Sequence, residues 1–534
     1  MLPPDDARNR KHKPMDRDPR LPGRDTISPV NGRVLDPATA FGVEGIQTRP
    51  TAYVGTRLTI SKSEDIEARF AIIREVAESL GWAARLEDED PKTVGLKFGI
   101  RKVTLSVGSD RVLLAPDGWT LLQQMRARHR DSLSKLSGIG LDHVVVSAPF
   151  DASHPFDASH PFDASHPFDA SHPFDASHPF DASHPVGGVG WPVMTYAVPG
   201  QGGRQPVAYV GEPPYRQPDF AGRRPVVAIL DTGCGRHEWL DDVVTTDQKL
   251  GSFEIGYTQP DTDPEEFWDQ AGALDGMIDP LSGHGTFIAG LVRQACPEAD
   301  ILSWRIVPSI GPLVESDWVT ALAQIAELIR KGRAGDDDGR IIDVLSLSMG
   351  YYHETPYDSL FDPTLWAILD DIAANGTLVV CSAGNDATSR PCFPAAFAPW
   401  DDGEDLVETP DGRLPIVSVG ALNPNGLTDA LFSNAGPWVR AYVEGASVIS
   451  TVPAFEGGLQ ATARTEAFGR TRDTIDPDDF RGGFSVWSGT SFAAPLMAGR
   501  LAKHLEPRIA DGDALDAALA RAFDAVYALT KITP

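Results

Sequence analysis

The chain has 534 residues, and its 75 acidic side chains exceed its 47 basic ones, which gives a net charge of −28. With 42% apolar residues, a chain of this length can bury at least one large core and form two to four domains, which excludes wholesale disorder. The negative charge argues against nucleic acids and anionic membrane surfaces as partners, because both require a basic surface.

No stretch reaches the roughly 20 consecutive apolar residues that cross a membrane. The N-terminus mixes acids, bases and prolines, whereas a secretory signal needs an apolar stretch of about 7–15 residues. We therefore expect a soluble, cytoplasmic protein. The four cysteines are expected to be reduced thiols, although Cys381 and Cys392 bracket a short loop and could pair in an oxidising compartment.

The first two of four parts in the chain are an arm and a small domain. Residues 1–50 are rich in proline, arginine and aspartate without an apolar period, which predicts an irregular or disordered arm. Residues 51–149 predict an α/β domain that opens with a strand over 52–60, a capping box at 61–64 and a helix that ends at Gly81. The remaining expected elements are strands over 93–99, 102–108 and 112–116, a helix near 118–130 and a strand over 141–147.

Residues 150–224 predict a long low-complexity linker. Its first part, 150–185, repeats the hexapeptide Phe-Asp-Ala-Ser-His-Pro six times, and a proline at every sixth position blocks a continuous helix or central strand. Each repeat places a histidine three residues after an aspartate, so weak metal binding is an alternative to a simple extended spacer. The Gly- and Pro-rich residues 186–224 continue the linker.

Residues 225–534 predict a larger α/β domain with a mostly parallel sheet. Five continuous β-branched and aliphatic runs have the length of buried strands: 225–231, 300–307, 341–348, 377–383 and 415–420. Between them, residues 317–330 and 362–374 carry apolar side chains at helical spacing, as expected of βαβ units. In such sheets the functional crevice lies beyond the carboxyl ends of the strands.

Four polar motifs fall near that expected crevice. Asp231 ends the first strand in an Asp-Thr-Gly sequence, and His284 lies between two glycines that allow close approach. Asn385 follows the Thr-Leu-Val-Val strand. Ser491 lies in the first turn of a helix predicted to end near Leu505, where free backbone N–H groups favour an oxyanion. Taken singly, each motif also has a structural explanation. Asp231 and Asn385 could belong to ordinary turns, His284 could be a structural histidine, and Ser491 could simply cap its helix.

Together, the four side chains form a complete acyl-transfer set of nucleophile, base, orienting carboxylate and oxyanion donor. The motifs Asp-Thr-Gly, His-Gly-Thr-x-x-Ala-Gly, Ala-Gly-Asn and Gly-Thr-Ser-x-Ala-x-Pro, in this order over 225–505, resemble those of the subtilisin-like (subtilase, peptidase S8) serine protease family. The resemblance implies a mostly parallel sheet flanked by helices and a serine endopeptidase that hydrolyses polypeptides.

By this resemblance, Ser491 attacks the peptide carbonyl, His284 transfers the proton and Asp231 orients the imidazole. Asn385 and the backbone N–H of Ser491 hold the oxyanion. The substrate would add as an extended strand, and the residues that the resemblance implies as its contacts are Ser348, Met349, Gly350, Ala383 and Gly384.

The resemblance assigns no metal ligand and requires no cofactor for the chemistry, and the sequence does not reveal whether structural calcium is bound. A non-catalytic peptide-binding or regulatory relative of the same fold is the alternative, against which the intact set of polar groups argues. Subtilisin relatives often carry a small α/β pro-domain that assists folding and plugs the active site. The domain at 51–149, ferredoxin-like or related, is therefore either such a pro-domain docked on the catalytic domain or a separate regulatory module.

Acidic side chains gather in two stretches of the C-terminal part, 261–266 and 400–411. Such runs usually mark a solvated face. The alternative is that they attract polypeptide substrates with basic residues near the cut.

Overall fold

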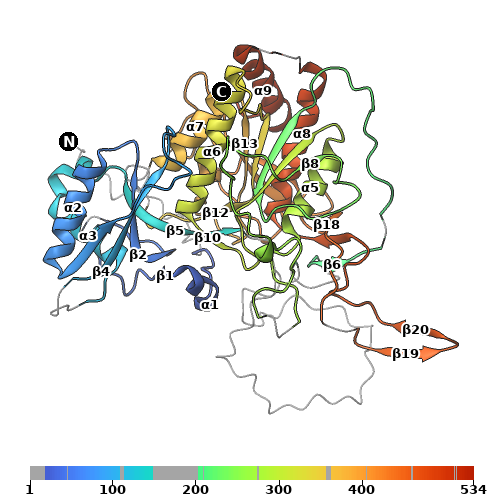
Figure 1. Ribbon diagram of the computed structural model, residues 1–534, viewed down its shortest axis with the longest axis horizontal. Helices are drawn as coiled ribbons and strands as arrows, with labels where there is room; N and C mark the ends of the chain where they lie inside the picture. Colours follow the sequence, from blue (N-terminus) through green and yellow to red (C-terminus); the bar gives the residue numbers. More distant parts are fainter. Residues whose placement is uncertain are drawn as a thin grey trace.

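The computed structural model describes residues 18–147, 196 and 202–533, apart from 45, 109–113, 209, 273–275, 356–362, 404–405, 459–460, 510–511 and 513. The six repeats and their histidines lie outside the described residues, as does most of the expected linker. Figure 1 shows a smaller unit built by the N-terminal part of the chain beside a larger unit built by the C-terminal part. Among the described helices, none combines the length and the apolar composition needed to cross a membrane.

The smaller unit consists of two helices and an antiparallel sheet. Its elements are β2 (Thr51–Ser61), α2 (Ile66–Ser79), β3 (Trp82–Leu86), β4 (Ile100–Val107), α3 (Gly118–Arg128) and β5 (Ile139–Ser147). The strands are ordered β5-β2-β4-β3 and every neighbouring pair is antiparallel, as in a split β-α-β arrangement. Both helices begin at an aspartate cap, because Asp65 accepts from the Ala68 N–H and Asp117 from the Thr120 N–H.

Two local predictions for this unit are wrong, and one strand was not predicted. The arm is not wholly irregular, since α1 (Arg24–Ile27) is helical and β1 (Gly32–Leu35) pairs with β2. Residues 93–99 form turns rather than a strand. The outer strand of the sheet is β3 instead, which the sequence pattern does not reveal because the alanines at positions 83 and 84 have weak strand propensity.

The larger unit is built on a seven-stranded parallel sheet, which confirms the predicted fold class. Its strand order is β17-β16-β13-β11-β7-β9-β8. In chain order the strands are β7 (Val226–Asp231), β8 (Val244–Thr245), β9 (Asp300–Arg305), β11 (Val344–Leu347), β13 (Leu378–Ser382), β16 (Val417–Leu422) and β17 (Ala441–Glu444).

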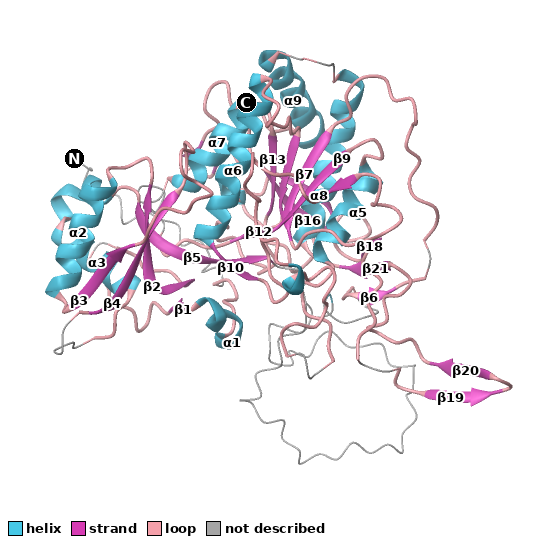
Figure 2. Cartoon of the chain, in the orientation of Figure 1, coloured by secondary structure: helices cyan, strands magenta, loops and turns pink. Residues whose placement is uncertain are grey.

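Helices cover both faces of this sheet (Figure 2). The helices α5 (His284–Ala295), α8 (Thr490–Leu505) and α9 (Leu515–Thr530) share a core with one face, and α6 (Glu315–Ala334) and α7 (Thr364–Ala374) share a core with the other. Successive residues of β7 alternate between the cores, since Val227 packs with the first group of helices and Ala228 with the second. Burial on both faces explains why the strands are continuous apolar runs rather than alternating ones.

Short strands complete the larger unit. They are β6 (Gln205–Pro206), β10 (Pro312–Val314), β12 (Met349–Gly350), β14 (Trp400–Asp401), β15 (Leu406–Val407), β18 (Val448–Thr451), β19 (Arg464–Ala467), β20 (Arg470–Asp473) and β21 (Phe484–Trp487).

All four cysteines are free thiols, so Cys381 and Cys392 form no disulfide.

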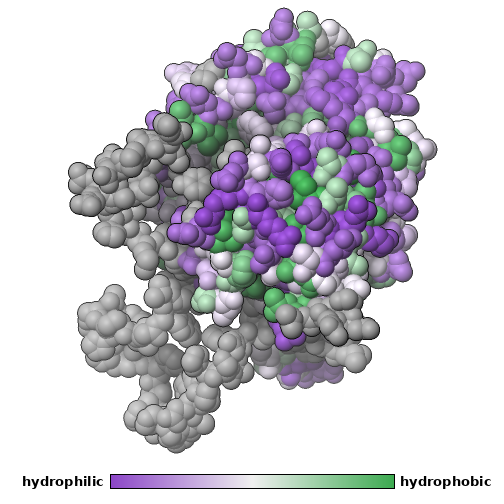
Figure 3. All heavy atoms as spheres, turned by 90° about the vertical axis from the view of Figure 1, so that its left-hand side faces the viewer, coloured by the Kyte–Doolittle hydropathy of each residue, from purple (hydrophilic) through white to green (hydrophobic). Residues whose placement is uncertain are grey.

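Strand β5 joins the two units. On one edge it pairs with β2 of its own sheet, and its C-terminal half pairs antiparallel with β10 and with β12 of the larger unit. The side chain of Val145 lies in the core that contains α6 and α7. By contrast, the outward face of the smaller unit carries mostly hydrophilic side chains with scattered apolar ones (Figure 3). The smaller unit therefore uses its sheet edge, not its outer face, to dock.

Substitution of Leu345 in the central strand β11 tests whether this strand lies in the core. It is fully buried, and we expect Leu345→Ala to lower the free energy of unfolding by about 2–5 kcal/mol, because a cavity remains where the side chain was. Leu427 is 86% exposed, and Leu427→Ala should change stability by no more than about 0.5 kcal/mol. Urea denaturation measures both variants, and equal effects would contradict the assignment of β11 to the core.

Candidate active site

Asp231 and His284 form a buried hydrogen-bonded pair at the carboxyl edge of the parallel sheet. Asp231 is the last residue of β7, and His284 is the first residue of α5. The helix starts there because Gly283 adopts a φ of 81°, a conformation that favours glycine. His284 Nδ1 lies 2.6 Å from Asp231 Oδ1, and neither residue is exposed. Because a carboxylate only accepts, Nδ1 carries the proton of this hydrogen bond, and Nε2 is left as the basic nitrogen.

Ser491 lies at the start of α8, beside this pair. Its neighbour Phe492 packs its ring 5.2 Å from the imidazole of His284, measured between centroids. The Ser491 hydroxyl donates to the carbonyl of Ser348 at 3.3 Å, and among the described residues His284 Nε2 has no hydrogen-bond partner. The structure thus brings the starts of α5 and α8 together, and the Ser491 hydroxyl contacts the Ser348 carbonyl.

Asn385, after strand β13, is tied to the same helix start. Its side-chain Oδ1 accepts from the N–H of Thr490 at 2.9 Å and from its hydroxyl at 2.8 Å. The oxygen is engaged with α8, and the Nδ2 end of the amide carries the donor groups. The preceding Gly384 has a φ of 98°, and a Cβ there would lie 2.5 Å from Asn434 Nδ2, so glycine is required.

A cleft opens beside Ser491 and is lined by both units of the protein. From the larger unit its walls include Ser348, Met349, Gly350, Ser382, Gly384, Asn385, Asp386, Thr490 and Ser491. From the smaller unit they include Arg20, Leu21, Pro22, Thr26, Thr51, Ala52, Val144 and Val146. Of the substrate contacts expected from the sequence, Ala383 is absent from these walls because its side chain is buried in the core with α6 and α7.

Strand β5 fills the edge of this cleft. It lies between β10 and β12, with Val146 opposite both Pro312 and Gly350, and Ser147 opposite Met349. This is the edge where an extended peptide is expected to add as a strand. The chain's own residues therefore make the backbone contacts that a bound peptide would make.

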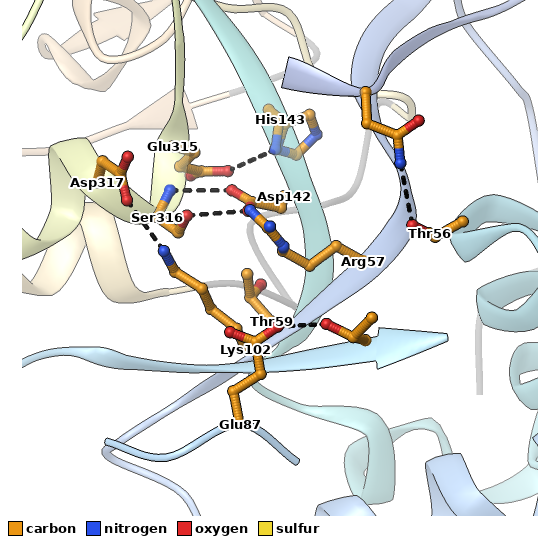
Figure 4. Close-up of polar contacts among 12 residues, drawn as sticks. Thr56, Arg57, Thr59, Glu87, Lys102, Asp142, His143, Glu315, Ser316 and Asp317 are labelled. Atoms are coloured by element: carbon orange, nitrogen blue, oxygen red, sulfur yellow. Dashed lines mark hydrogen bonds and ion pairs between the residues drawn. The ribbon is translucent and has the colours of Figure 1, made fainter. Parts of the chain in front are cut away.

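A buried group of ionisable side chains anchors β5 (Figure 4). His143 contacts Glu315 through Nδ1 at 2.7 Å and Glu354 through Nε2 at 2.8 Å, and its ring stacks on Tyr351 at 4.6 Å. Burial alone would lower the pKa of His143, but the two carboxylates outweigh it and raise the pKa well above the ordinary value of 6.5. The imidazolium of the smaller unit thus neutralises carboxylates of the larger one.

The preceding residue, Asp142, caps a helix of the other unit. Its carboxylate accepts from the N–H and from the hydroxyl of Ser316, each at 2.9 Å, at the start of α6 (Figure 4). The N-cap residue of α6, Val314, makes no side-chain cap hydrogen bond. Arg57 lies 3.1 Å from the same carboxylate, and Lys102 pairs with Asp317 at 2.9 Å. The contact favours docking because a carboxylate at a helix N-terminus interacts with the positive end of the dipole.

His143, His353 and Glu354 offer ligand atoms that lie within 4.8 Å of one another. Such a cluster resembles a metal site, but the charges already balance without an ion. Glu315 and Glu354 face the imidazolium of His143, and the guanidinium of Arg126 lies 3.7 Å from Glu354. We therefore assign this cluster to docking of the two units.

The acidic stretch 261–266 does not form one solvated face. Asp261 and Glu266 are exposed, whereas Glu265 is buried and accepts hydrogen bonds next to the Asp231–His284 pair. Sequence reasoning did not assign a role to Glu265 individually or to Asp142 and His143. Their partners lie far away in the chain, so no local spacing could have identified them.

Comparisons with known proteins agree with this geometry. The model of the Subtilase family matches residues 222–520. The intracellular serine protease of Paenibacillus polymyxa is 27% identical over 53% of this chain and 66% of its own length. Mycosin-4 of Mycobacterium tuberculosis is 25% identical over 52% and 54%, and the major intracellular serine protease of Bacillus subtilis is 23% identical over 53% and 68%. The chain thus spans between about half and two-thirds of the length of these relatives.

Two solved structures also align. The crystal structure of a lanthipeptide protease has a TM-score of 0.35 and 20% identity, over 53% of this chain and 74% of the other. A cold adapted subtilisin-like serine proteinase has a TM-score of 0.33 and 17% identity, over 59% and 86%.

Replacement of His143 tests the ionic anchor of β5. His143→Gln leaves two buried carboxylates without their cation, so docking of β5 should weaken by about 3–5 kcal/mol. In the native protein the raised pKa gives a stabilisation that is complete below pH 6.5 and is lost as the pH rises through the folded-state value. Hydrogen exchange of the β5 amides relative to β7, corrected for intrinsic rates, should therefore show protection that falls at alkaline pH, and this fall should be absent in His143→Gln.

The control for this measurement is His129→Gln, a partly exposed histidine of the same unit, which should leave the protection of β5 unchanged. Equal pH profiles for the native protein and His143→Gln would contradict the anchoring role.

Proposed function

Because the chain belongs to the subtilase family, we propose that it is a serine endopeptidase that hydrolyses polypeptides through Asp231, His284 and Ser491. The observation that carries this proposal is the buried Asp231–His284 hydrogen bond beside a helix that begins with Thr490 and Ser491. The names of its relatives add support, since two are called intracellular serine proteases. On the same basis we propose that the protein acts inside the cell.

In the proposed reaction, the Ser491 hydroxyl turns from the Ser348 carbonyl toward His284 and attacks the substrate carbonyl. His284 Nε2 takes the hydroxyl proton and later gives it to the leaving amine. Asp231 keeps Nδ1 protonated and stabilises the imidazolium through the 2.6 Å contact. The resulting acyl-enzyme is then hydrolysed by water, which His284 activates in the same way.

The oxyanion of each tetrahedral intermediate would accept hydrogen bonds from Asn385 Nδ2 and from the backbone N–H of Ser491. The support for this role is the contact of Asn385 Oδ1 with Thr490, which fixes the amide before substrate arrives. A preorganised donor of this kind contributes about 3 kcal/mol of transition-state stabilisation. The substrate backbone would pair with β10 and β12 in place of β5, near Ser348 and Gly384.

Basic residues near the cut would find an acceptor in Asp386, and we propose a preference for such substrates. Asp386 lies on the wall of the cleft, where its carboxylate accepts from the Tyr352 hydroxyl at 2.6 Å and from the backbone N–H of Arg20 at 3.1 Å. Displacement of the arm that holds Arg20 would remove the contact of its backbone N–H with this carboxylate.

We also propose that the smaller unit is a pro-domain that blocks the cleft until the chain is cut after β5. The support is the pairing of β5 with β10 and β12, together with the buried ionic contacts of Asp142 and His143. A separate module that regulates without removal is the alternative for this unit.

A non-catalytic peptide-binding relative is the alternative for the whole protein, and labelling of Ser491 separates the two. A serine-directed fluorophosphonate should label the native protein after removal of the smaller unit, and Ser491→Ala should abolish labelling. The variant should lower kcat by about 10⁶-fold, the loss found for subtilisin itself. The exposed Ser252→Ala is the control and should behave as the native protein. Unchanged peptidase activity in Ser491→Ala would contradict the proposal.

The blocking role of β5 predicts a lag before activity appears. Freshly folded full-length protein should be inactive, and activity should rise as the chain is cut between β5 and residue 225. Val145→Ala removes buried apolar contacts, which should weaken docking by about 1–2 kcal/mol and shorten the lag about 5- to 30-fold. N-terminal sequencing of the active form measures where the cut lies, and an uncut chain with full activity would rule out this role.

A further inference from the structure

Glu265 is a buried carboxylate that the proposed chemistry does not use. It follows the short 3₁₀ turn η4 (Pro260–Thr262), and only 3% of it is exposed, whereas the adjacent Glu266 is exposed. Buried carboxylates are rare unless they are paired with a cation or serve a function. Among the described residues, no lysine, arginine or histidine forms an ion pair with Glu265.

Both oxygens of Glu265 contact residues adjacent to the Asp231–His284 pair. Oε1 accepts from the Thr232 hydroxyl at 2.5 Å and from the Gly285 N–H at 3.1 Å, and Oε2 accepts from the Thr286 hydroxyl at 2.5 Å. Thr232 follows Asp231 in the chain, and Gly285 and Thr286 follow His284. One carboxylate therefore ties the end of β7 to the start of α5.

The hydroxyl of Thr232 is shared between two carboxylates. Its oxygen accepts from the Gly285 N–H at 2.7 Å, and it lies 2.5 Å from Glu265 Oε1 and 3.3 Å from Asp231 Oδ1. A hydroxyl has only one proton to donate. When Glu265 is ionised, the proton goes to Glu265. When Glu265 is protonated, it can donate to the Thr232 oxygen, which frees the hydroxyl proton to bond Asp231.

We propose that Glu265 is a positioning residue for the Asp231–His284 pair, and that the peptidase proposed above is fully active only while Glu265 is ionised. An additional hydrogen bond from Thr232 would draw negative charge from Asp231 Oδ1, the atom that supports the imidazolium. The ionised form of Glu265 withholds that bond and keeps Asp231 an effective partner of His284. The inference rests on the proposed function and adds a residue to it.

The surroundings of Glu265 bring the pKa of its carboxyl group close to neutral pH. Burial raises its pKa to about 7, against the hydrogen bonds from Thr232 and Thr286, and the negative charges of Asp263 and Asp231 raise it further. Burial, followed by the charge of Glu265, also raises the pKa of the Cys234 thiol.

Arg305 is the cation on the adjacent strand β9, and it shares a pocket wall with Glu265. Its guanidinium donates to the backbone carbonyls of Tyr257 and Gln259. These contacts direct its hydrogen bonds elsewhere, so the charge of Glu265 is supported by neutral donors.

The change in stability as Glu265 ionises distinguishes a positioning role of this residue from a merely structural one. Because the folded-state pKa of Glu265 lies above its ordinary value of 4.5, folding favours the protonated form, and the stability it gives is lost as the pH rises toward and through 7. The ionised carboxylate therefore costs stability at the pH where we expect it to support activity.

Glu265→Gln tests the inference in the processed, active protein. Above pH 8 we expect kcat to fall about 10-fold with little change in KM, while the melting temperature stays equal to or above that of the native protein. In the native protein the acid limb of log(kcat/KM) should be steeper than in Glu265→Gln, because ionisation of Glu265 adds one proton to the dependence. In Glu265→Gln this added dependence should be absent.

The matched control is Glu266→Gln, an exposed neighbour of the same charge, which should keep the native rate and slope. Thr232→Val removes only the shared hydroxyl, and it should also reduce the slope of the acid limb below the native one even if Glu265→Gln fails to fold. A native slope and rate in both variants would overturn the inference. Failure of the processed protein, from which the smaller unit has been removed, to react with a fluorophosphonate would instead overturn the proposed function, so the two failures are distinguishable.

Discussion

The hydrogen bond between Asp231 and His284 joins the end of strand β7 to the first residue of α5, and the rest of the larger unit supports it. An imidazole and a carboxylate removed from water are stable only when further donors satisfy the carboxylate. The Thr232 N–H supplies one at 2.8 Å. On the other side, the rings of Trp487 and Phe492 pack on the imidazole and exclude water. The pair therefore depends on α5 and α8 packing on the same face of the sheet.

The interface between the units is built from charges as much as from apolar contact. Consecutive residues of β5 serve different partners, since Asp142 caps α6 and His143 neutralises Glu315 and Glu354. Val145 adds apolar burial to these contacts. Ionised groups regain favourable hydration when the surfaces separate, whereas a wholly apolar interface would leave both units prone to aggregation. Such an interface can hold tightly and still release soluble parts.

Much of the larger unit could be predicted from its sequence, because parallel strands buried on both faces appear as continuous apolar runs. Each of the five predicted strands is present, with bounds that differ by only a few residues. The motifs around Asp231, His284 and Ser491 were also recognisable, because glycines and helix starts leave local patterns. The strand at Trp82 was missed because alanines conceal its alternation, and the turns at 93–99 were mistaken for a strand.

Long-range contacts could not be predicted in this way. His143 meets Glu315 and Glu354 only when two separately patterned units dock, and a single sequence contains no signal for that pairing. Glu265 was hidden for a similar reason, because it belongs to a run of acids in which Asp261 and Glu266 are exposed. Burial of one member of such a run depends on how the loop folds back onto Thr232 and Thr286.

The position of β5 between β10 and β12 also has a kinetic consequence. If the protein is the protease proposed above, β5 would compete with substrate as a tethered ligand while the chain is continuous, at an effective concentration set by the linker between Ser147 and the larger unit. Even if β5 often separates from β10 and β12, it will pair with them again faster than a dilute peptide can bind there. Once the linker is cut, the same strand becomes a diffusible inhibitor and its occupancy falls with dilution. Scission would thus convert a concentration-independent block into one governed by mass action.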